Sequence, residues 1–265
     1  MDIFSAMENE SPIIEKELVN KPLDYDKTER VLLIDADSLL YTAIYNPDPL
    51  VEDDIEESKF RLDNKIQEIH NNIESYYNIV KTMYFLGGSN NFRYELYPEY
   101  KANRPKEKHP FISELKEYLV TKYEAIIAPK GEADDILYST YLKCRDNCVV
   151  SSIDKDVFFA TYNCPQYNYR SYKDVLGTFS QITEEESKLA LATQVIMGDA
   201  VDNIKGAVGK GKKYCEKHLK LGMTDYQFIK NILIAYKHSY KNYKLAKEMI
   251  ILNYNLVKLH DLIDM

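Results

Sequence analysis

The chain has 265 residues and a formal net charge of −8 at pH 7. Its hydrophobic fraction of 45% and charged fraction of 29% are ordinary for a globular protein, which excludes a wholly disordered chain, a collagen-like chain and a coiled-coil rod. No apolar run reaches the roughly 18–20 residues of a membrane span, and residues 1–10 lack a basic segment followed by an apolar one, so we expect a cytoplasmic protein without a secretory signal.

The first part of the chain alternates predicted strands and helices. Residues 31–35 are a short apolar run typical of a strand that is buried on both faces. Further strands are predicted over 82–86, 124–128 and 148–153. Helices are predicted over 38–45, 62–80 and 132–143. This order predicts an α/β fold with a parallel central sheet flanked by helices.

The strand signals end near residue 180. Thr183, followed by three glutamates over 184–186, is a capped helix start, and the residues after it indicate further helices. We therefore expect an N-terminal extension over 1–30, an α/β core over 31–180 and a helical region over 181–265.

Acidic residues follow three of the predicted strands. They are Asp35 and Asp37 after the first strand, Glu132, Asp134 and Asp135 after the third, and Asp154 and Asp156 after the fourth. Asp199 and Asp202 follow a helix that ends near Met197. Ligands of open α/β sheets bind at the carboxyl ends of the strands, so we expect the first three groups to converge there and the last to reach them. A helix N-cap explains any single Asp equally well, but several clusters at matching positions favour a metal site.

The ligand chemistry of these acids narrows the choice of metal. Oxygen ligands without a nearby His or Cys favour Mg²⁺ or Mn²⁺ over Zn²⁺. Crowded carboxylates repel one another, and divalent cations remove that penalty. Two such ions about 4 Å apart are the usual device for phosphodiester hydrolysis. We therefore predict two Mg²⁺ ions, for which Mn²⁺ can substitute.

Two cationic segments lie within this acidic chain. Residues 100–108 contain four bases and one acid, and residues 205–220 contain six lysines and one acid. The second segment also contains Gly206, Gly209 and Gly211, which allow backbone N–H groups to approach a phosphate. A solvated lysine-rich helix is the alternative, but the spaced glycines favour binding to a phosphate backbone.

Taken together, these motifs resemble the 5′-nuclease superfamily of flap endonucleases and 5′–3′ exonucleases, most of all its phage-encoded members, which include phage RNase H-like proteins. The matching segments are, in family order, 34–35, 98–104, 131–135, 151–156, 196–204 and 205–211. The resemblance implies a PIN-like α/β core, a helical arch over 100–122 and a C-terminal helix–three-turn–helix region.

The resemblance also implies which residues surround the metal ions. Those of the first ion would be Asp35, Glu132, Asp134 and Asp135. Those of the second would be Asp154, Asp156, Asp199 and Asp202, with Asp154 required for catalysis.

The residues implied to contact nucleic acid lie in the two cationic segments. Lys101 and Arg104 would be catalytic cations on the scissile phosphate, and Tyr100 would stack on a base. Lys106 and Lys108 would contact the strand that passes the arch. The duplex would be held by Gly206, Gly209, Lys210, Gly211, Lys212 and Lys213, with K⁺ as an optional ligand.

The implied function is that of a metal-dependent, structure-specific 5′ nuclease. Its substrate would be DNA or an RNA–DNA hybrid with a 5′ flap, nick or branch. The implied role is removal of RNA primers or flaps in phage DNA replication, in the host cytoplasm. We expect a monomer, with a single-strand-binding protein or a polymerase as candidate partners.

Leu86 departs from the superfamily pattern. The superfamily carries an Asp at the end of the second strand, and counting back from Phe92 places that position at Leu86, which Gly87 follows. Asp37 or a water molecule would then substitute. The departure motivates an alternative function, a non-catalytic binder of branched DNA. A PIN-type ribonuclease is a further alternative, since that class shares the acidic sheet edge but lacks the glycine-rich clamp.

Overall fold

The computed structural model describes residues 28–45, 54–105, 107, 109–170, 177–240 and 242–263. The expected N-terminal extension lies outside the described residues except for 28–30, and so do Lys106 and Lys108. The chain groups into two compact units. The α/β unit comprises the described residues of 28–91, 106–182 and 259–263, and the helical unit comprises Phe92–Pro105 and Thr183–Lys258.

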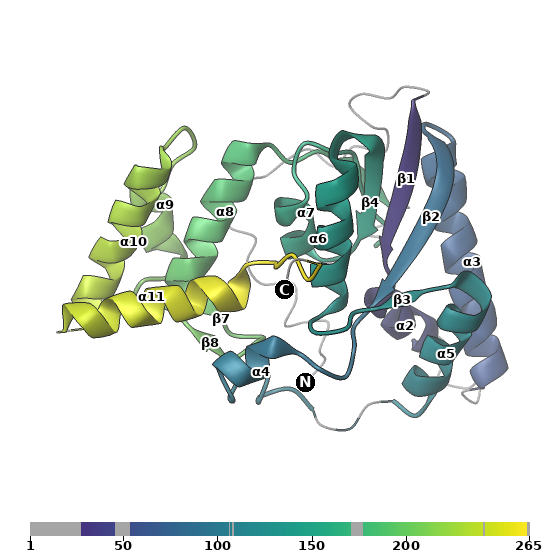
Figure 1. Cartoon of the computed structure of the whole chain (residues 1–265), viewed down its shortest axis with the longest axis horizontal. Helices are drawn as coiled ribbons and strands as arrows, with labels where there is room; N and C mark the ends of the chain where they lie inside the picture. Colours follow the sequence, from purple (N-terminus) through teal and green to yellow (C-terminus); the bar gives the residue numbers. More distant parts are fainter. Residues whose placement is uncertain are drawn as a thin grey trace. The chain divides into compact units, whose positions relative to one another are not determined.

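The α/β unit is built on a six-stranded sheet with the order β3–β2–β1–β4–β5–β6. Figure 1 labels the first four strands of this order, with β1 beside β2. The strands are β1 (Glu29–Asp35), β2 (Asn78–Leu86), β3 (Ile126–Ile127), β4 (Cys148–Ser152), β5 (Gln166–Asn168) and β6 (Thr178–Ser180). The pairs from β3 to β5 are parallel, and β6 is antiparallel to β5. Leu32, Leu33 and Ile34 of the central strand are fully buried, as expected for a strand covered on both faces. The predicted α/β fold is confirmed, with an antiparallel strand added at one edge.

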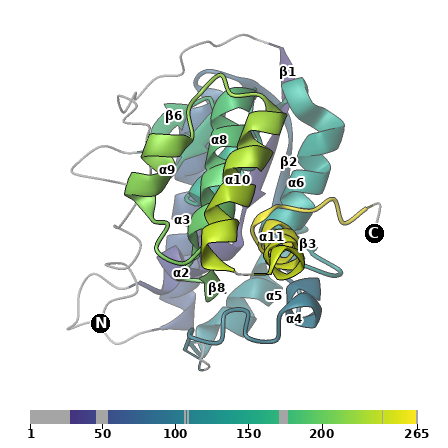
Figure 2. The ribbon, with the colours of Figure 1, turned by 90° about the vertical axis from the view of Figure 1, so that its left-hand side faces the viewer.

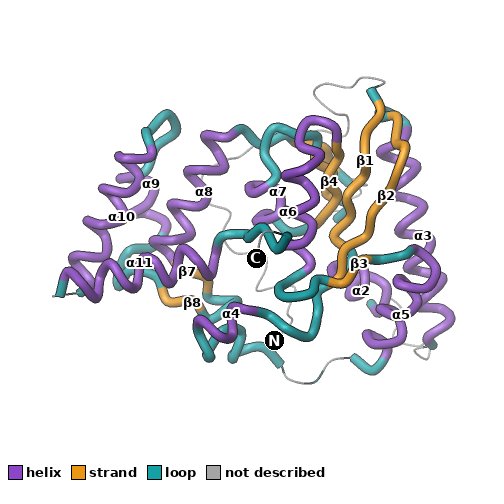
Figure 3. The backbone as a smooth tube through the Cα atoms, in the orientation of Figure 1, coloured by secondary structure: helices purple, strands orange, loops and turns teal. Residues whose placement is uncertain are grey.

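Helices cover this sheet on both faces, and in Figure 3 the strands of the unit pass between them. On one side α2 (Asp37–Ile44), α3 (Ile55–Glu74) and α5 (Phe111–Tyr123) pack on one another. On the other, α6 (Ala133–Cys144) contacts α7 (Lys155–Ala160), and the short 3-10 helix η1 (Arg145–Asn147) leads into β4. Because β1, β3 and β4 are parallel, the helices that follow them all begin at the same edge of the sheet.

The helix predicted over 62–80 is α3, but it ends at Glu74. The apolar residues of the predicted stripe are buried as far as Ile73. Tyr76 and Tyr77 lie beyond the helix, and their rings contact Phe179 of β6 at centroid separations of 5.4 and 6.2 Å. Tyr76 and Tyr77 therefore pack against the edge of the sheet. They happen to continue the helical spacing of apolar residues, so the prediction extended the helix beyond its true end.

The described residues of the helical unit form five helices and a short hairpin. The helices are α4 (Phe92–Leu96), α8 (Glu184–Met197), α9 (Lys212–His218), α10 (Asp225–Ser239) and α11 (Tyr243–Val257). The hairpin between α8 and α9 consists of β7 (Gly198–Asp199) and β8 (Ile204–Lys205). Figure 2 shows α9 and α10 beside α8, which both of them contact. The predicted capped start at Thr183 is confirmed by a capping box with Glu186. The β7–β8 pair was not expected, because two-residue strands carry no sequence period.

The observed units change between Ile182 and Thr183, close to the predicted boundary near residue 180, but two further segments group differently from that division. Residues 92–105 group with the helical unit, where the buried Arg93 donates hydrogen bonds to two carbonyls at the end of α11, at 2.9 and 3.0 Å. Residues 259–263 group with the α/β unit, where the His260 N–H donates to Asp135 at 2.9 Å. Each of these two segments thus forms hydrogen bonds within the unit to which it belongs, with residues far away in the sequence. Within the described ranges, the helices are too short or too polar to span a bilayer.

Candidate active site

Asp35 is the last residue of β1 and lies buried at the carboxyl edge of the sheet. It is 2% exposed, and its Oδ2 atom accepts hydrogen bonds from the hydroxyls of Ser38 (2.7 Å) and Ser152 (2.9 Å). Its Oδ1 atom is also buried, and no described residue donates a hydrogen bond to it. Burying a carboxylate oxygen without a donor is costly, so this atom is suited to face a cation.

Three acids come together at the start of α6, and two of them make structural contacts. Glu132 is the N-cap, and its own N–H donates to Asp135 at 3.0 Å to complete a capping box. Glu132 also accepts a hydrogen bond from the Asn91 side chain at 3.0 Å, and the fully buried Asp135 accepts the His260 N–H at 2.9 Å. Asp134 takes no part in the cap, and no described residue donates a hydrogen bond to it. The helix cap therefore does not explain Asp134.

Asp154 and Asp156 follow β4 at the start of α7. Asp154 is the N-cap and accepts the Asp156 N–H at 2.8 Å. The Asp154 N–H donates to the Ser152 hydroxyl at 2.9 Å, and the same hydroxyl donates to Asp35. Ser152, which the sequence did not single out, thus links the acids that follow β1 and β4. The cap interpretation holds for Asp154, but an ionised carboxylate has about four acceptor sites, so a cap leaves room for a metal ion.

The electrostatics of these groups indicate that the carboxylates lie close to one another. Burial raises the pKa of Asp35 to about 6, with nearby carboxylates adding to the rise and two serine hydrogen bonds opposing it. Burial also holds the pKa of Asp134 well above its ordinary value, and repulsion from four neighbouring acids adds to this. Asp135 is one of these four acids, but both of its oxygens already accept backbone N–H groups. We call the other carboxylates that share this repulsion, which come from three strand ends, the acidic edge: Asp35, Glu132, Asp134 and Asp154.

The acidic edge fits a divalent cation. All of its side chains offer oxygen ligands, and the Oδ1 atom of Asp35 accepts no hydrogen bond from a described residue. Repulsion between the carboxylates makes their ionisation costly, and a bound cation would offset that cost. In the part of the chain that the structure describes, no three acidic, His or Cys side chains already stand in a chelating arrangement. The donor set of the acidic edge therefore suits a divalent cation, and which ion it binds stays a prediction.

The raised pKa of Asp35 predicts a stability that depends on pH. A carboxyl group whose pKa is raised by folding binds more protons in the folded state, so stability falls as pH rises from about 4 to about 6. The rise in pKa from 3.8 to about 6 corresponds to about 3 kcal/mol. Urea unfolding of the protein in EDTA across this range measures the loss. Added Mg²⁺ should reverse it at pH 7, and Asp35→Asn should flatten the curve. A curve for the Asp35→Asn variant as steep as the wild-type curve would contradict the assignment.

Asp37 lies beside the end of β2, next to the position where the superfamily acid is missing. Leu86 is fully buried, and the Gly87 N–H donates to the Asp37 Oδ2 atom at 2.9 Å. A Cβ atom on Gly87 would lie 2.6 Å from that oxygen, so the glycine is needed for this approach. Lys116 of α5 pairs with the Asp37 Oδ1 atom at 3.0 Å and donates to the Gly87 carbonyl at 2.9 Å. Asp37 thus lies beside the position of the missing acid, with a lysine partner that the sequence did not reveal, and its role as a substitute ligand stays a prediction.

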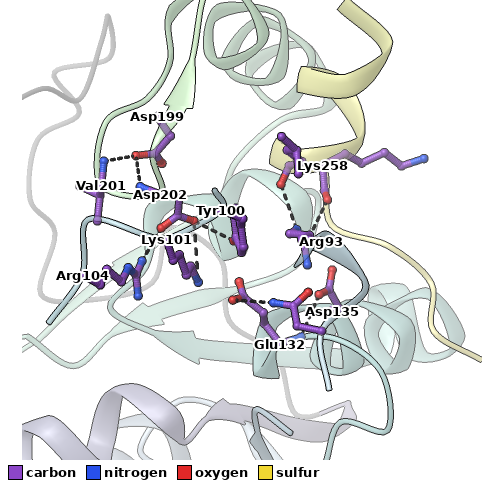
Figure 4. Close-up of polar contacts among 12 residues, drawn as sticks. Arg93, Tyr100, Lys101, Arg104, Glu132, Asp135, Asp199, Val201, Asp202 and Lys258 are labelled. Carbon is purple, nitrogen blue, oxygen red and sulfur yellow. Dashed lines mark hydrogen bonds and ion pairs between the residues drawn. The ribbon is translucent and has the colours of Figure 1, made fainter. Parts of the chain in front are cut away.

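In the helical unit, a second acidic group lies within the turn that joins β7 to β8. Asp199 ends β7, and its Oδ1 atom accepts two backbone N–H groups of the turn at 2.8 and 3.3 Å. Asp202 contacts the side chains of Tyr100, Lys101 and Arg104, which come from the first cationic segment (Figure 4). The helical unit therefore brings both predicted phosphate-binding cations to one of the predicted metal ligands.

Tyr100 does not have the exposed ring that stacking on a base requires. The residue is 2% exposed and belongs to the apolar core of the helical unit. Its ring meets Tyr94 edge to face at a centroid separation of 5.6 Å, and its hydroxyl donates to the Asp202 Oδ2 atom at 2.9 Å. In this structure the packing around the ring leaves no face open, so stacking on a base would require the ring to leave the core, and that role stays a prediction. The observed role is that of a buried hydrogen-bond donor.

The glycine-rich segment contains glycines with different physical roles. A Cβ atom on Gly206 would lie 2.2 Å from the backbone of Met197, so this glycine allows β8 to pack closely against the end of α8. Gly209 has a φ of 69° and no neighbour within 4 Å, so it is required by the turn itself. Gly211 is the N-cap of α9, which begins at Lys212. Gly206 thus has a packing role, and a role of these glycines in phosphate binding stays a prediction.

The lysines of this segment lie at the surface of the helical unit. Lys213 is exposed, and Lys210 and Lys212 are partly exposed. The Lys210 ammonium lies 4.6 Å from the centre of the Tyr214 ring, which orders its long side chain by a cation–π contact. These positions suit contacts with phosphate groups, and that role stays a prediction.

Comparison with known proteins places this arrangement in a family. Residues 30–170 match the family described as 5′-3′ exonuclease, N-terminal resolvase-like domain, and this segment contains the whole acidic edge. The chain is also similar to the flap endonuclease Xni of Shewanella sp. (strain W3-18-1), with 27% identity over 247 residues, which are 87% of this chain and 89% of the relative.

Two solved structures share the fold. The crystal structure of the T5 D15 protein co-crystallised with metal ions has a TM-score of 0.57 at 17% identity, covering 88% of this chain and 89% of that chain. The bacteriophage T5 D15 flap endonuclease in a pseudo-enzyme-product complex with DNA and metal ions gives the same TM-score of 0.57, identity of 17% and coverage of 88% and 89%. At such low identity the likeness concerns the fold.

Proposed function

The chain belongs to the family of 5′–3′ exonucleases with an N-terminal resolvase-like domain, and from this membership we propose that it is a metal-dependent, structure-specific 5′ nuclease. The observation that carries the proposal is the acidic edge, where carboxylates from three strand ends lie close together and where burial and repulsion between carboxylates raise the pKa values of Asp35 and Asp134. A relative named as a flap endonuclease, which is aligned over most of both chains, supports the same class of reaction.

The proposed substrate is a duplex of DNA or RNA–DNA hybrid with a 5′ flap, nick or branch. The proposed metal is Mg²⁺, as two ions that Mn²⁺ can replace, and K⁺ is an optional ligand of the glycine-rich segment. The proposed role is removal of RNA primers or flaps in phage DNA replication, in the host cytoplasm. The protein would act as a monomer, with a single-strand-binding protein or a polymerase as partner.

Within each unit, separate residues would carry separate parts of the reaction. In the α/β unit the acidic edge, with Asp135 and Asp156 next to it, would hold the metal. In the helical unit Asp199 and Asp202 offer further oxygen ligands, and Lys101 and Arg104 would bind the phosphate and stabilise its developing charge. A bound divalent metal supplies an acidic water molecule and stabilises the leaving oxygen. Lys116, paired with Asp37, would keep that carboxylate at the end of β2.

Cleavage of a labelled flap tests the proposal. A duplex with a 5′-labelled single-stranded flap is incubated with the protein in Mg²⁺, in Mn²⁺ and in EDTA, and the products are sized. We expect short 5′ products that end near the junction, only when a divalent metal is present. Such products would also establish that Leu86 is tolerated. Cleavage that persists in EDTA after extensive dialysis would contradict the metal-dependent reaction.

A non-catalytic binder of branched DNA is the second candidate. The observation that favours it is Leu86, whose fully buried side chain places no carboxylate at the end of β2. Binding of the flap duplex without cleavage in both metals would support this function. A PIN-type ribonuclease differs from both candidates, since it would cut single-stranded RNA that has no duplex.

The lysines of the glycine-rich segment provide a test of duplex binding. Replacing Lys210, Lys212 and Lys213 with alanine should weaken binding and reduce the slope of log K against log salt by about 2–3, since each lost phosphate contact removes about 0.9. The matched control replaces the exposed Lys230, Lys237 and Lys244, which lie on α10 and α11 of the same unit. Equal slopes for the two triple variants would show that the segment is not the clamp.

A further inference from the structure

Asp202 is the centre of a cluster that contains both proposed phosphate-binding cations. The Tyr100 hydroxyl donates to its Oδ2 atom at 2.9 Å, and the Lys101 ammonium lies 3.7 Å from the same oxygen. The Arg104 guanidinium pairs with its Oδ1 atom (Figure 4). We call these four residues the Asp202 cluster. Both oxygens of the carboxylate are therefore occupied by groups that belong to one short segment of the chain.

The backbone holds the same two segments together. The Lys101 N–H donates to the Asp202 carbonyl at 2.9 Å, and the Asn203 side chain donates to the Glu99 carbonyl at 2.7 Å. Lys101 and Asn203 have positive φ angles of 54° and 59°. Residues other than glycine adopt this conformation at a cost and keep it only where surrounding contacts impose it. The cluster is thus a built feature of the turn and not a chance meeting of long side chains.

The partners differ in how easily they can leave the carboxylate. The side chains of Asp202 and Lys101 are 18% and 15% exposed, so their interaction is largely screened from solvent. The Arg104 side chain is 46% exposed, so it can exchange Asp202 for another anion without crossing the protein interior. Guanidinium groups bind carboxylate and phosphate with the same paired geometry, which makes such an exchange chemically direct.

We infer that Asp202 is a positioning residue that restrains Lys101 and Arg104 in the free protein and releases them to the substrate phosphate when it turns to a divalent cation. The inference rests on the proposed function. A carboxylate that accepts a cation interacts less strongly with its ammonium and guanidinium partners, and a phosphate that takes those partners frees the carboxylate. The two binding events must then favour each other by the same factor, since coupling between sites is reciprocal.

A purely structural ion pair makes the opposite prediction. If Asp202 only fastened residues 99–104 to the turn, its loss would disorder the two cations and weaken nucleic-acid binding. If Asp202 restrains them, its loss increases the positive charge open to phosphate, and binding becomes tighter even without metal. The sign of the change in metal-free binding therefore separates the two roles.

The first experiment measures binding of a 5′-flap duplex in EDTA over a series of salt concentrations. Asp202→Asn should bind more tightly than wild type, and the slope of log K against log salt should become steeper by about 1–2, because two cations gain phosphate contacts worth about 0.9 each. Asp225→Asn is the matched control, since it removes one charge from a carboxylate that pairs with Lys188 in the same unit. This control should leave the slope unchanged.

Each outcome of this experiment has a definite meaning. A slope for Asp202→Asn equal to that of wild type, or weaker binding by a variant whose melting curve is unchanged, overturns the inference. Failure of wild type to bind the flap duplex at all overturns the proposed function, and the inference with it. The double variant Asp202→Asn/Arg104→Gln should lose about half of the increase in slope, because the released Lys101 still contributes about 0.9.

A second experiment does not depend on the folding of the Asp202 variant. Mn²⁺ binding to the protein alone is measured by calorimetry for wild type, Arg104→Gln and Lys230→Gln. Arg104→Gln removes a competitor for the Asp202 carboxylate, so Mn²⁺ should bind about 5-fold more tightly, the lower end of common coupling factors. Lys230→Gln removes a charge of the same sign from an exposed position of α10 in the same unit and should change the affinity little. Equal affinities for wild type and Arg104→Gln would overturn the inference.

Discussion

Replacing Asp134 with asparagine is expected to lower the rate of flap cleavage by about a thousandfold, which corresponds to about 4 kcal/mol of transition-state stabilisation. Asp134 does not cap α6 and accepts no hydrogen bond from a described residue, so the substitution removes charge from the acidic edge without removing a structural contact. The measurement is the single-turnover rate with excess protein and saturating Mg²⁺. Binding of the flap duplex in EDTA should stay within a few-fold of wild type.

The same substitution should stabilise the metal-free protein. Burial and the neighbouring carboxylates raise the pKa of Asp134, so its ionisation costs folding free energy as pH rises, and asparagine does not ionise. We therefore expect the Asp134→Asn variant to be more stable than wild type at pH 8, as measured by urea unfolding in EDTA. A lower rate combined with higher metal-free stability is the signature of a functional carboxylate.

Asp146→Asn is the matched control for this variant. Asp146 is exposed and lies in η1, just before the amino end of β4, whereas the acidic edge lies at the carboxyl ends of the strands. It should keep the rate and stability of wild type. A wild-type rate for Asp134→Asn would remove Asp134 from the metal ligands, and a loss of both rate and stability would indicate a structural role.

The acidic edge could be anticipated because topology and sequence point to the same place. Asp35 ends an apolar run that is typical of a central strand, β1. Asp154 follows β4, which pairs with β1 in parallel. Parallel strands bring such residues to one edge whatever the details of packing. The helix start at Thr183 was equally predictable, since a capping box is a local pattern.

Contacts between distant segments could not be anticipated in the same way. In the sequence, Lys116 is one of several lysines of the predicted arch. Its ion pair with Asp37 depends on how α5 packs, which the sequence pattern does not show. Tyr100 matches a family aromatic by sequence, yet its exposure depends on the core that closes around it. The edge strands β5 and β6 have three residues each, too few for an alternation of polar and apolar side chains to be visible.

Replacing Asp135 with alanine is expected to destabilise the protein by about 3 kcal/mol. Asp135 was predicted to lie at the first metal, but both of its oxygens accept backbone N–H groups, from Glu132 at 3.0 Å and from His260 at 2.9 Å. The residue is fully buried, so the variant leaves two donors without their partner and a helix without half of its capping box. The measurement is urea unfolding in EDTA, which removes any contribution of metal.

Hydrogen exchange distinguishes this role from an ordinary helix cap. Asp135 ties residues 259–263 to α6, so amides of this segment should exchange faster in Asp135→Ala, with the His260 amide affected most. Glu186→Ala is the matched control, because Glu186 occupies the same capping-box position in α8, and it should cost about 1 kcal/mol without changing exchange of 259–263. Unchanged stability and exchange in Asp135→Ala, together with weaker Mn²⁺ binding, would contradict the structural role and return Asp135 to the metal ligands. The expected result would instead assign Asp135 a structural role: together with Ser139, whose hydroxyl accepts the Leu262 N–H at 2.7 Å, it joins residues 259–263 to α6, the helix that also carries Asp134.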